Sequence, residues 1–192
     1  MPAPPEQFDA IAGTGSIMHK RLLCTPLFSV EHREFERSGH RPVILQVVVH
    51  PGAVVILPIL ADGRIVMIRN YRYTVERELW ELPAGTLEPG ETPLETGRRE
   101  LEEETGYRAG VMTPLLEFYT SPGVLTERMH AFLATELTPV GQKLQDSERI
   151  QVELMEGEVV QGMLLRGDFM DGKTIAVLGL NFLRRAAETR NA

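Results

Sequence analysis

The segment from Gly85 to Tyr107 marks both ends of a helix, which leaves few ways to arrange the residues around it. Thr92 and Pro93 supply an N-cap followed by a first-turn proline, and Glu95 stands where a capping box is completed. Gly106 stands where the C-terminal end of a helix favours a positive φ. The sequence therefore predicts a helix from about 92 to 105.

One face of this helix is acidic. Glu100, Glu103 and Glu104 are spaced i, i+3 and i+4, so a helix gathers their carboxylates within one turn. Like charges in this arrangement oppose helix formation by roughly 0.2–0.5 kcal/mol per pair. A divalent cation would offset the repulsion, and hard oxygen ligands suit Mg²⁺ or Mn²⁺. The alternative is that the face is simply solvated, and composition alone favours that alternative.

Another face of the helix is apolar. Leu94, Gly97 and Leu101 are expected to form it and to be buried. Glycine in the middle of a helix costs on the order of 1 kcal/mol relative to alanine. Gly97 therefore indicates close packing of the helix against a strand or loop.

Strands are predicted on both sides of the helix. Alternating or β-branched runs indicate strands within about 15–49 and at 53–60, 64–69, 78–82, 111–119 and 128–136. The blocks VILQVVV and AVVILPI suit two buried strands. Helices are predicted at 153–165 and 173–187. Strands and helices mix without regular βαβ alternation, which favours the α/β (α+β) class and a layered sandwich.

Size and charge exclude several classes of protein. The 192 residues, 43% of them apolar, suit one globular domain, with or without a small appendage. The net charge of −7 repels phosphate backbones, so no nucleic-acid partner is expected. Pro42–Ala61 is uncharged, but Gln46, Pro51 and Pro58 would interrupt a spanning helix, so no membrane span is expected. The single Cys24 fits a reducing, cytoplasmic setting.

The acidic residues follow a fixed spacing. The residues that define it are Gly85, Glu91, Arg99, Glu100, Leu101, Glu103, Glu104, Gly106 and Tyr107. This spacing resembles the signature of the Nudix hydrolases, G-x5-E-x7-R-E-U-x-E-E-x-G-U, where U is a bulky aliphatic residue. Eight of the nine specified positions match, and Tyr107 is bulky but aromatic. The departure at Tyr107 concerns packing.

The resemblance implies a fold and an organisation of the chain. Nudix proteins form an α/β/α sandwich around a mixed sheet, and the signature forms a loop–helix–loop that holds a divalent metal against a diphosphate. Residues 50–192 would be this hydrolase domain. Residues 1–49 resemble the small antiparallel sheet that precedes it in the family, which commonly exchanges across a homodimer and completes the substrate pocket. A homodimer is therefore expected.

The resemblance also implies roles for the acidic residues. The expected ligands of Mg²⁺ or Mn²⁺ are the Ala84 carbonyl and the carboxylates of Glu100, Glu103 and Glu104. Glu103 could instead lie behind the ligands. Arg99 would pair with a signature carboxylate and orient it, a support that metal ligands generally need, and Glu91 would be structural.

A catalytic base is often recruited from a loop outside the signature. Glu148 is the candidate, because its context in QDSERIQVELM resembles the loop that carries the catalytic glutamate in ADP-ribose pyrophosphatases. Asp146 and Glu153 are the alternatives. Catalytic roles are thus expected for Glu148, Glu103 and Arg99.

Sequence flanking the signature resembles the ADP-ribose pyrophosphatase branch. The resemblance lies in RNYRYTVERELWELPAG, which ends at Gly85, and in a Ser-Pro-Gly at 121–123. Arg72 would clamp the diphosphate, and Tyr71 or Tyr73 would lie against a base or ribose. Trp80 is expected in the core or at a dimer contact. The expected substrate-binding residues are Arg72, Tyr71, Glu81, Pro122 and Gly123.

The implied reaction is hydrolysis of a nucleoside diphosphate sugar. ADP-ribose, cleaved to AMP and ribose 5-phosphate, is the leading expectation. GDP-mannose, FAD or NADH is the alternative substrate. A further alternative is a module that binds ADP-ribose without cleaving it, although such modules usually lose the signature glutamates that this chain retains.

Overall fold

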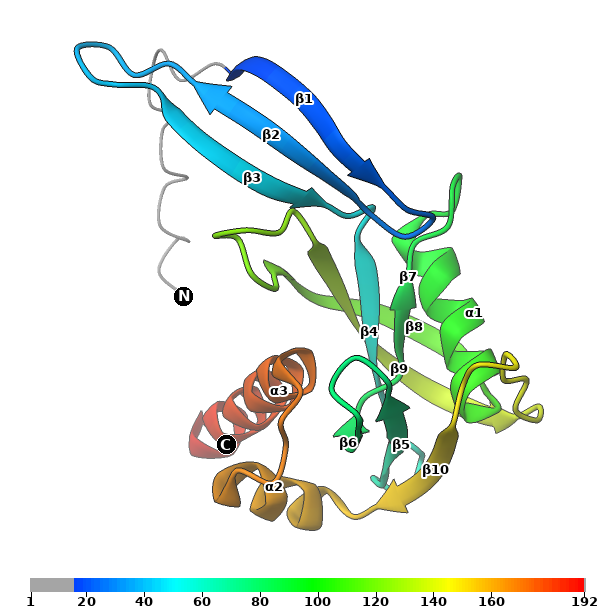
Figure 1. The fold of residues 1–192 in the computed structure, drawn as a ribbon. Coiled ribbons are helices and arrows are strands. Elements are labelled where there is room, and N and C mark those ends of the chain that lie inside the picture. The colour runs from blue at the N-terminus through cyan, green and yellow to red at the C-terminus, as the bar shows by residue number, and fades with distance from the viewer. Residues whose placement is uncertain (1–15, 192) are drawn as a thin grey trace. The chain divides into compact units, whose positions relative to one another are not determined.

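The computed structural model describes residues 16–191, and the proline-rich start of the chain lies outside that range. The chain divides into two compact units (Figure 1). One unit holds the residues up to His50 together with Ser121–Thr126. The other holds Pro51–Thr120 and Glu127–Ala192.

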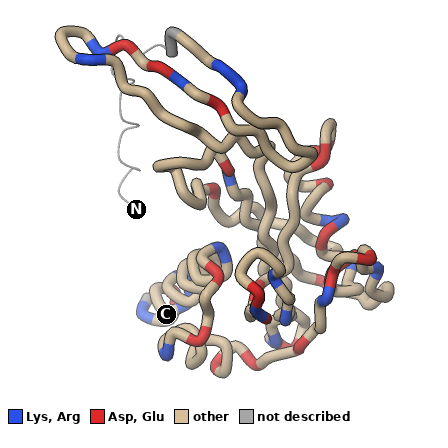
Figure 2. Tube along the Cα trace, in the orientation of Figure 1, with Lys and Arg blue, Asp and Glu red and all other residues tan. Residues whose placement is uncertain are grey.

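The first unit is an antiparallel sheet with the strand order β1-β2-β3. Its strands are β1 (Ser16–Cys24), β2 (Ser29–Phe35) and β3 (Val43–Val49). The segment 121–126 attaches to β3, because the Val48 N–H donates to the Val124 carbonyl (2.8 Å) and the Val48 carbonyl accepts from the Thr126 N–H (2.9 Å). Figure 2 shows acidic and basic residues interspersed along this sheet rather than gathered by sign.

The prediction that VILQVVV forms a buried strand is wrong in one respect. The segment is a strand, β3, but Ile44 is 54% exposed and Leu45 41% exposed. Among the described residues of this unit, no helix lies over the sheet to bury them. The apolar side chains therefore stay at the surface of the unit.

The second unit contains a four-stranded sheet of order β7-β4-β9-β8 and a three-stranded sheet of order β10-β5-β6. Its strands are β4 (Ala53–Pro58), β5 (Ile65–Arg72), β6 (Arg77–Glu81), β7 (Ala84–Thr86), β8 (Tyr107–Tyr119), β9 (Arg128–Pro139) and β10 (Ile150–Met155). Its helices are α1 (Pro93–Thr105), α2 (Gly157–Arg166) and α3 (Gly172–Asn191). The larger sheet is mixed, because β4 pairs parallel with β9 and antiparallel with β7.

Strand β4 lies between two apolar layers, because successive side chains of a strand point to opposite faces. Val55 belongs to a core that includes Leu178 of α3. Val54 belongs to a core that includes Leu101 of α1. Each such side chain contributes roughly 1.5–3 kcal/mol on full burial. The sheet thus has helices on both faces, which confirms the predicted α+β sandwich (Figure 1).

The ends of α1 confirm the predicted helix. The Thr92 hydroxyl accepts from the Glu95 N–H (3.3 Å), and the Glu95 carboxylate accepts from the Thr92 N–H (2.8 Å). Gly106 adopts the left-handed conformation, with φ of 71°. Gly97 packs closely, because a Cβ there would come 3.0 Å from Met112 Cε. The expected burial of Leu94 is wrong: in the first turn it borders a surface groove instead of the core.

The C-terminal elements differ from the prediction at one point. Residues 153–155 are predicted to be helical but complete β10, and α2 begins only at Gly157. Pairing with β5, in which Val152 stands opposite Ile68, outweighs the local preference for helix. The predicted helix at 173–187 is confirmed as α3. Within residues 16–191, no helix has both the length and the apolar character needed to cross a membrane.

Candidate active site

Helix α1 carries two of its glutamates into the interior. Glu100 and Glu104, one turn apart, are 6% and 3% exposed, whereas Glu103 is half-buried. The alternative of a simply solvated face therefore fails for Glu100 and Glu104. Burying a carboxylate is costly unless it is paired or binds a metal, so each needs an explanation.

Glu104 accepts a hydrogen bond from the backbone but forms no ion pair within residues 16–191, although the charge of Arg72 acts on it. Its Oε2 accepts a hydrogen bond from the Ala84 N–H (2.8 Å), and no described Lys, Arg or His forms an ion pair with it. Burial raises the pKa of Glu104 to about 8, and the neighbouring Glu100 adds to the rise. Burial also raises the pKa of Glu100, against the opposing charge of Arg99.

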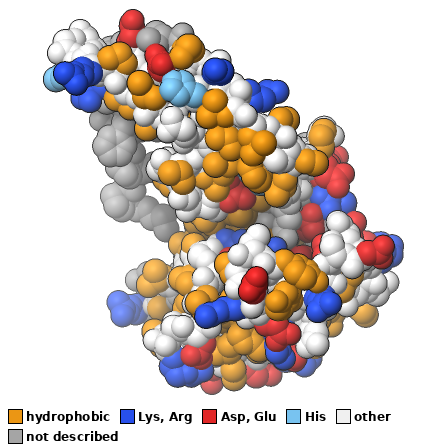
Figure 3. All heavy atoms as spheres, in the orientation of Figure 1, with side chains coloured by type: hydrophobic (Ala, Val, Ile, Leu, Met, Phe, Trp, Pro, Cys, Tyr) orange, Lys and Arg blue, Asp and Glu red, His pale blue; other side chains and the backbone are white. Residues whose placement is uncertain are grey.

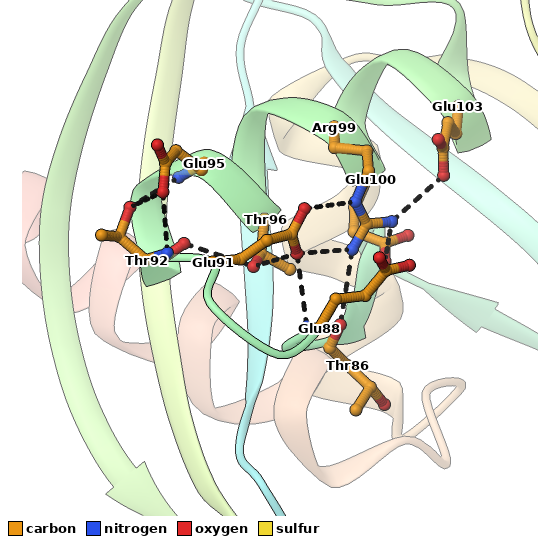
Figure 4. A network of polar contacts seen from close by, with 9 residues as sticks. All are labelled: Thr86, Glu88, Glu91, Thr92, Glu95, Thr96, Arg99, Glu100 and Glu103. Atoms are coloured by element: carbon orange, nitrogen blue, oxygen red, sulfur yellow. Dashed lines mark hydrogen bonds and ion pairs between the residues drawn. The ribbon is translucent and has the colours of Figure 1, made fainter. Parts of the chain in front are cut away.

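Arg99 is the centre of the polar network on this face of α1 (Figure 4). Its Nε and Nη2 donate to the two oxygens of Glu91 at 2.9 and 3.0 Å. Its Nη1 donates to Glu100 at 2.7 Å and to Glu103 at 3.2 Å. The hydrogen bond from Arg99 lowers the pKa of Glu91 to about 2. The structure therefore brings Arg99, Glu91, Glu100 and Glu103 together.

Gly85 makes room for the buried carboxylates. It lies in β7, beside Ala84, which pairs with Val55 of β4. A Cβ at residue 85 would overlap the carboxylate of Glu100. The glycine at the start of the signature is therefore required by the close approach of strand β7 to the helix.

Glu148 lies in the turn before β10 and is half-buried. Its carboxylate accepts from the Gln145 N–H (2.8 Å), and its charge contributes to the raised pKa values of Glu100 and Glu104. It is therefore electrostatically close to both. The two alternatives, Asp146 and Glu153, are exposed.

The donor set fits a divalent cation. Glu100 and Glu104 offer hard oxygen atoms in a site where their negative charge is not fully compensated. Within residues 16–191, no three acidic, His or Cys side chains already stand as one group suited to a metal ion. Arg99 holds the carboxylates of Glu100 and Glu103 in the arrangement seen.

A cavity of about 540 Å³ adjoins this site at Ala84 and Gly85. Its lining residues are Ala53, Arg72, Ala84, Gly85, Thr86, Phe118, Tyr119, Thr120, Glu127, Met129, Asp171, Gly172, Lys173 and Ala176. It therefore combines two cationic side chains, Arg72 and Lys173, and two acidic ones, Glu127 and Asp171, with aromatic and small ones. Sequence reasoning missed Lys173, whose only local signal is the Asp-Gly-Lys-Thr that starts α3.

The predicted substrate-binding residues fall in both units of the structure. Arg72 lines the cavity, whereas the next residue back along β5, Tyr71, does not and makes an edge contact with Tyr73. Pro122 and Gly123 belong to the first unit, in the segment attached to β3.

Glu81 does not stand open to a ligand. Its side chain is 1% exposed, and it accepts from Arg72 Nε (2.8 Å) and Arg72 Nη2 (2.6 Å). Trp80, beside it, packs against the core, as predicted, and the guanidinium of Arg69 lies 5.5 Å from its ring centroid.

The chain is similar to proteins of a known family. A model of the NUDIX domain matches residues 49–176. The chain is 40% identical to the ADP-ribose pyrophosphatase of Bacillus subtilis over 147 residues, which cover 76% of this chain and 80% of that protein. It is 35% identical to the ADP-ribose pyrophosphatase of Mycobacterium tuberculosis over 164 residues, covering 84% and 79%.

More distant similarities extend the comparison. A GDP-mannose pyrophosphatase of Escherichia coli is 34% identical over 143 residues, covering 69% of this chain and 73% of that protein. A crystal structure described as an ADP compounds hydrolase superposes with a TM-score of 0.79 at 23% identity, covering 94% of this chain and 97% of the other. At that identity the superposition supports the fold alone.

Proposed function

This chain belongs to the Nudix family, as a pyrophosphohydrolase of the ADP-ribose pyrophosphatase-like kind, and we propose that it cleaves ADP-ribose to AMP and ribose 5-phosphate. One observation carries the proposal. The cavity that holds Arg72 and Lys173 meets, at Ala84 and Gly85, the helix that carries buried Glu100 and Glu104. A diphosphate in that cavity would reach both cationic and acidic groups.

Mg²⁺ or Mn²⁺ would be held by the carboxylates of Glu100 and Glu104, with Glu103 and the Ala84 carbonyl as the remaining candidates. When bound, the cation would neutralise phosphate oxygens and lower the pKa of a bound water. Arg99 would orient Glu100 and Glu103 from behind, which is the support that ligating carboxylates need.

The residues around the cation have their own parts in the hydrolysis. Arg72 would bind diphosphate oxygens through the N–H groups that Glu81 leaves free. Glu148 would accept a proton from the attacking water. As the water oxygen bonds to one phosphorus, the bond from that phosphorus to the bridging oxygen breaks. The products are the two phosphate monoesters, AMP and ribose 5-phosphate.

The size of the cavity supports a substrate of this class. Pockets for small ligands usually enclose about 300–1,000 Å³, and this one measures about 540 Å³. Phe118 and Tyr119 offer aromatic surface for a base or ribose. Two relatives named as ADP-ribose pyrophosphatases favour ADP-ribose.

Product analysis tests the substrate. The purified protein is incubated with Mg²⁺ and, in separate reactions, with ADP-ribose, GDP-mannose, FAD and NADH. Faster turnover of ADP-ribose, with AMP and ribose 5-phosphate as products, supports the proposal. Much faster turnover of GDP-mannose, favoured by the Escherichia coli relative, would replace ADP-ribose as the substrate. Tight binding of ADP-ribose without any product would favour a non-catalytic binding module.

A homodimer is part of the proposal, with residues 1–49 as the dimerisation element and residues 50–192 as the hydrolase domain. The described part of the first unit exposes large apolar side chains, which Figure 3 shows gathered over its strands. They are Met18, Leu22, Leu23, Leu27, Ile44, Leu45 and, in the segment attached to β3, Val124. Exposed apolar surface of this kind often marks a protein interface. Analytical ultracentrifugation of the full chain tests it, and a monomer at micromolar concentration would contradict it.

A further inference from the structure

Lys173, in the first turn of helix α3, links that helix to Glu81 at the end of strand β6. Its Nζ donates to Glu81 Oε2 at 2.8 Å and to Asp171 Oδ1 at 2.9 Å, and its side chain is only 12% exposed. Together with the fork of Arg72 on Glu81, these contacts form a chain of four charged residues, two positive and two negative. Lys173 has no role in the signature spacing.

Hydrogen bonds fix the start of α3, and they therefore fix the backbone of Lys173. Asp171 Oδ2 caps the helix by accepting from the Thr174 N–H (3.0 Å) and the Thr174 hydroxyl (2.6 Å). The fully buried Thr174 hydroxyl accepts in turn from the Leu82 N–H at 2.9 Å, directly after Glu81 in the chain. Helix and strand are thereby locked together next to the ammonium group.

The fork of Arg72 on Glu81 determines what Arg72 can offer a ligand. A guanidinium has five N–H donors, and Glu81 takes one on Nε and one on Nη2. Three donors are left on a side chain that lines the cavity and is 38% exposed. Glu81, almost completely buried, offers both oxygens to Arg72 and shares one with Lys173, so it does not stand free to contact substrate.

We propose that Lys173 is a positioning residue: by neutralising Glu81 it holds the guanidinium of Arg72 in place for a diphosphate. This inference rests on the proposed function, because it assigns to Arg72 the diphosphate of that reaction. Without Lys173, Glu81 and Asp171 face a single positive charge, and the surplus negative charge lies beside the anion-binding edge of Arg72. Binding of an anionic substrate therefore weakens, while the acidic helix α1 is untouched.

The test is a cycle of four proteins: the wild type, Lys173→Met, Glu81→Gln and the double variant. Two readouts are taken, the kcat and KM for ADP-ribose and the Kd for inorganic pyrophosphate by calorimetry. Lys173→Met is expected to raise KM and the pyrophosphate Kd about tenfold, with kcat within about threefold, as for loss of ground-state binding. Lys173→Arg, which keeps the charge, restores both to within about threefold of the wild type.

Because Lys173 is proposed to act through Glu81, the effects of Lys173→Met and Glu81→Gln on the pyrophosphate Kd are expected to be non-additive. In the Glu81→Gln background, Lys173→Met changes the pyrophosphate Kd by less than about twofold. The double variant removes one charge of each sign and so keeps the net charge of the wild type. Comparing its pyrophosphate Kd with that of a folded single variant remains informative if the other single variant folds poorly. Thermal unfolding checks the folding of all four proteins. Arg166→Met is the control, because it removes a cation from an exposed pair with Asp168 and leaves both readouts unchanged.

Two outcomes overturn the inference. An equal loss from Lys173→Met in both backgrounds means that the ammonium acts on the ligand itself. No loss from Lys173→Met in the wild-type background means that it has no part in binding. The proposed function can fail separately. If the wild type binds pyrophosphate but does not cleave ADP-ribose, the assignment of ADP-ribose as the substrate is wrong. The pyrophosphate Kd values of the four proteins still decide the role of Lys173.

Discussion

Two glutamates of this protein are almost equally buried and yet stand in opposite electrostatic surroundings. Glu81, 1% exposed, accepts from Arg72 and Lys173. Glu104, 3% exposed, accepts from one backbone N–H, and no described cation forms an ion pair with it. Burial raises the pKa of Glu104 to about 8.

The difference supports the proposal that Glu81 serves the fold whereas Glu104 holds a ligand. Glu81 has its charge compensated within the protein, so its removal should leave Arg72 without its ion-pair partner and Lys173 with Asp171 alone. Burial of Glu104 is offset only in part, by the hydrogen bond from the Ala84 N–H and by the charge of Arg72. In the proposed function, a divalent cation bound by Glu100 and Glu104 would offset the rest of that cost.

The first prediction concerns Glu81. Glu81→Gln leaves Arg72 and Lys173 without their shared counter-ion and is expected to lower the free energy of unfolding by about 3 kcal/mol. Urea unfolding followed by fluorescence measures the change. A variant as stable as the wild type would show that this buried network contributes nothing to stability, and the contrast with Glu104 would then be lost.

The same substitution at Glu104 is expected to act in the opposite direction. The pKa of Glu104 is raised from the ordinary 4.5 to about 8, so its contribution to stability is complete below pH 4.5 and is lost as the pH rises towards 8. Glu104→Gln should therefore stabilise the metal-free protein, by little at pH 4.5 and by on the order of 3 kcal/mol at pH 7. Urea unfolding with EDTA at both pH values measures this. Equal or lower stability at pH 7 contradicts it.

Activity distinguishes Glu104 in another way. Glu104→Gln is expected to reduce kcat by two orders of magnitude or more, about 2.7 kcal/mol, as for loss of a metal ligand. Steady-state hydrolysis of ADP-ribose with Mg²⁺ measures it. A rate near that of the wild type would remove Glu104 from the metal site, whatever its effect on stability.

Glu148 should show a smaller effect, because it is proposed to accept a proton rather than to hold the cation. Glu148→Gln is expected to lower kcat about tenfold while leaving metal affinity within about twofold. Mn²⁺ titrations together with kcat measure both properties. If Glu148→Gln and Glu104→Gln weaken metal binding equally, Glu148 is a ligand.

An exposed ion pair gives the lower limit of the comparison. The pair between Arg166 and Asp168 is largely exposed, with side-chain exposures of 63% and 39%. Arg166→Met is expected to change the free energy of unfolding by less than about 0.5 kcal/mol, since solvent screens such pairs. Urea unfolding beside Glu81→Gln measures the difference that burial makes. A loss as large as that of Glu81→Gln would contradict it.

The sequence predicts local features of this fold well. Helix α1 begins and ends where Thr92 and Gly106 place it, because capping depends on residues within a few positions of each other. The strands at 53–58 and 65–72 follow their β-branched runs for the same reason. Residues 153–155 could not be assigned from local preference, since their partner is β5, far away in the chain.

The site was only half predictable for the same physical reason. The spacing of Glu100 and Glu104 puts them on one face of a helix, but their burial depends on β7 and on the loop before β10. Lys173 lies 92 residues beyond Glu81, and no local pattern connects the two. Contacts of that range are set by the packing of α3 on the sheet, which the sequence alone does not specify.

Calorimetric titration with Mn²⁺ tests whether Glu104 is reserved for a cation. The wild type, Glu104→Gln and Glu102→Gln are titrated at pH 7. Glu102 is the matched control, because it lies on the same helix and pairs with Arg108. We expect Glu104→Gln to bind Mn²⁺ at least about tenfold more weakly than the wild type and Glu102→Gln to bind it equally well. Equal affinity in all three proteins would contradict the assignment of the buried carboxylates to a metal ion.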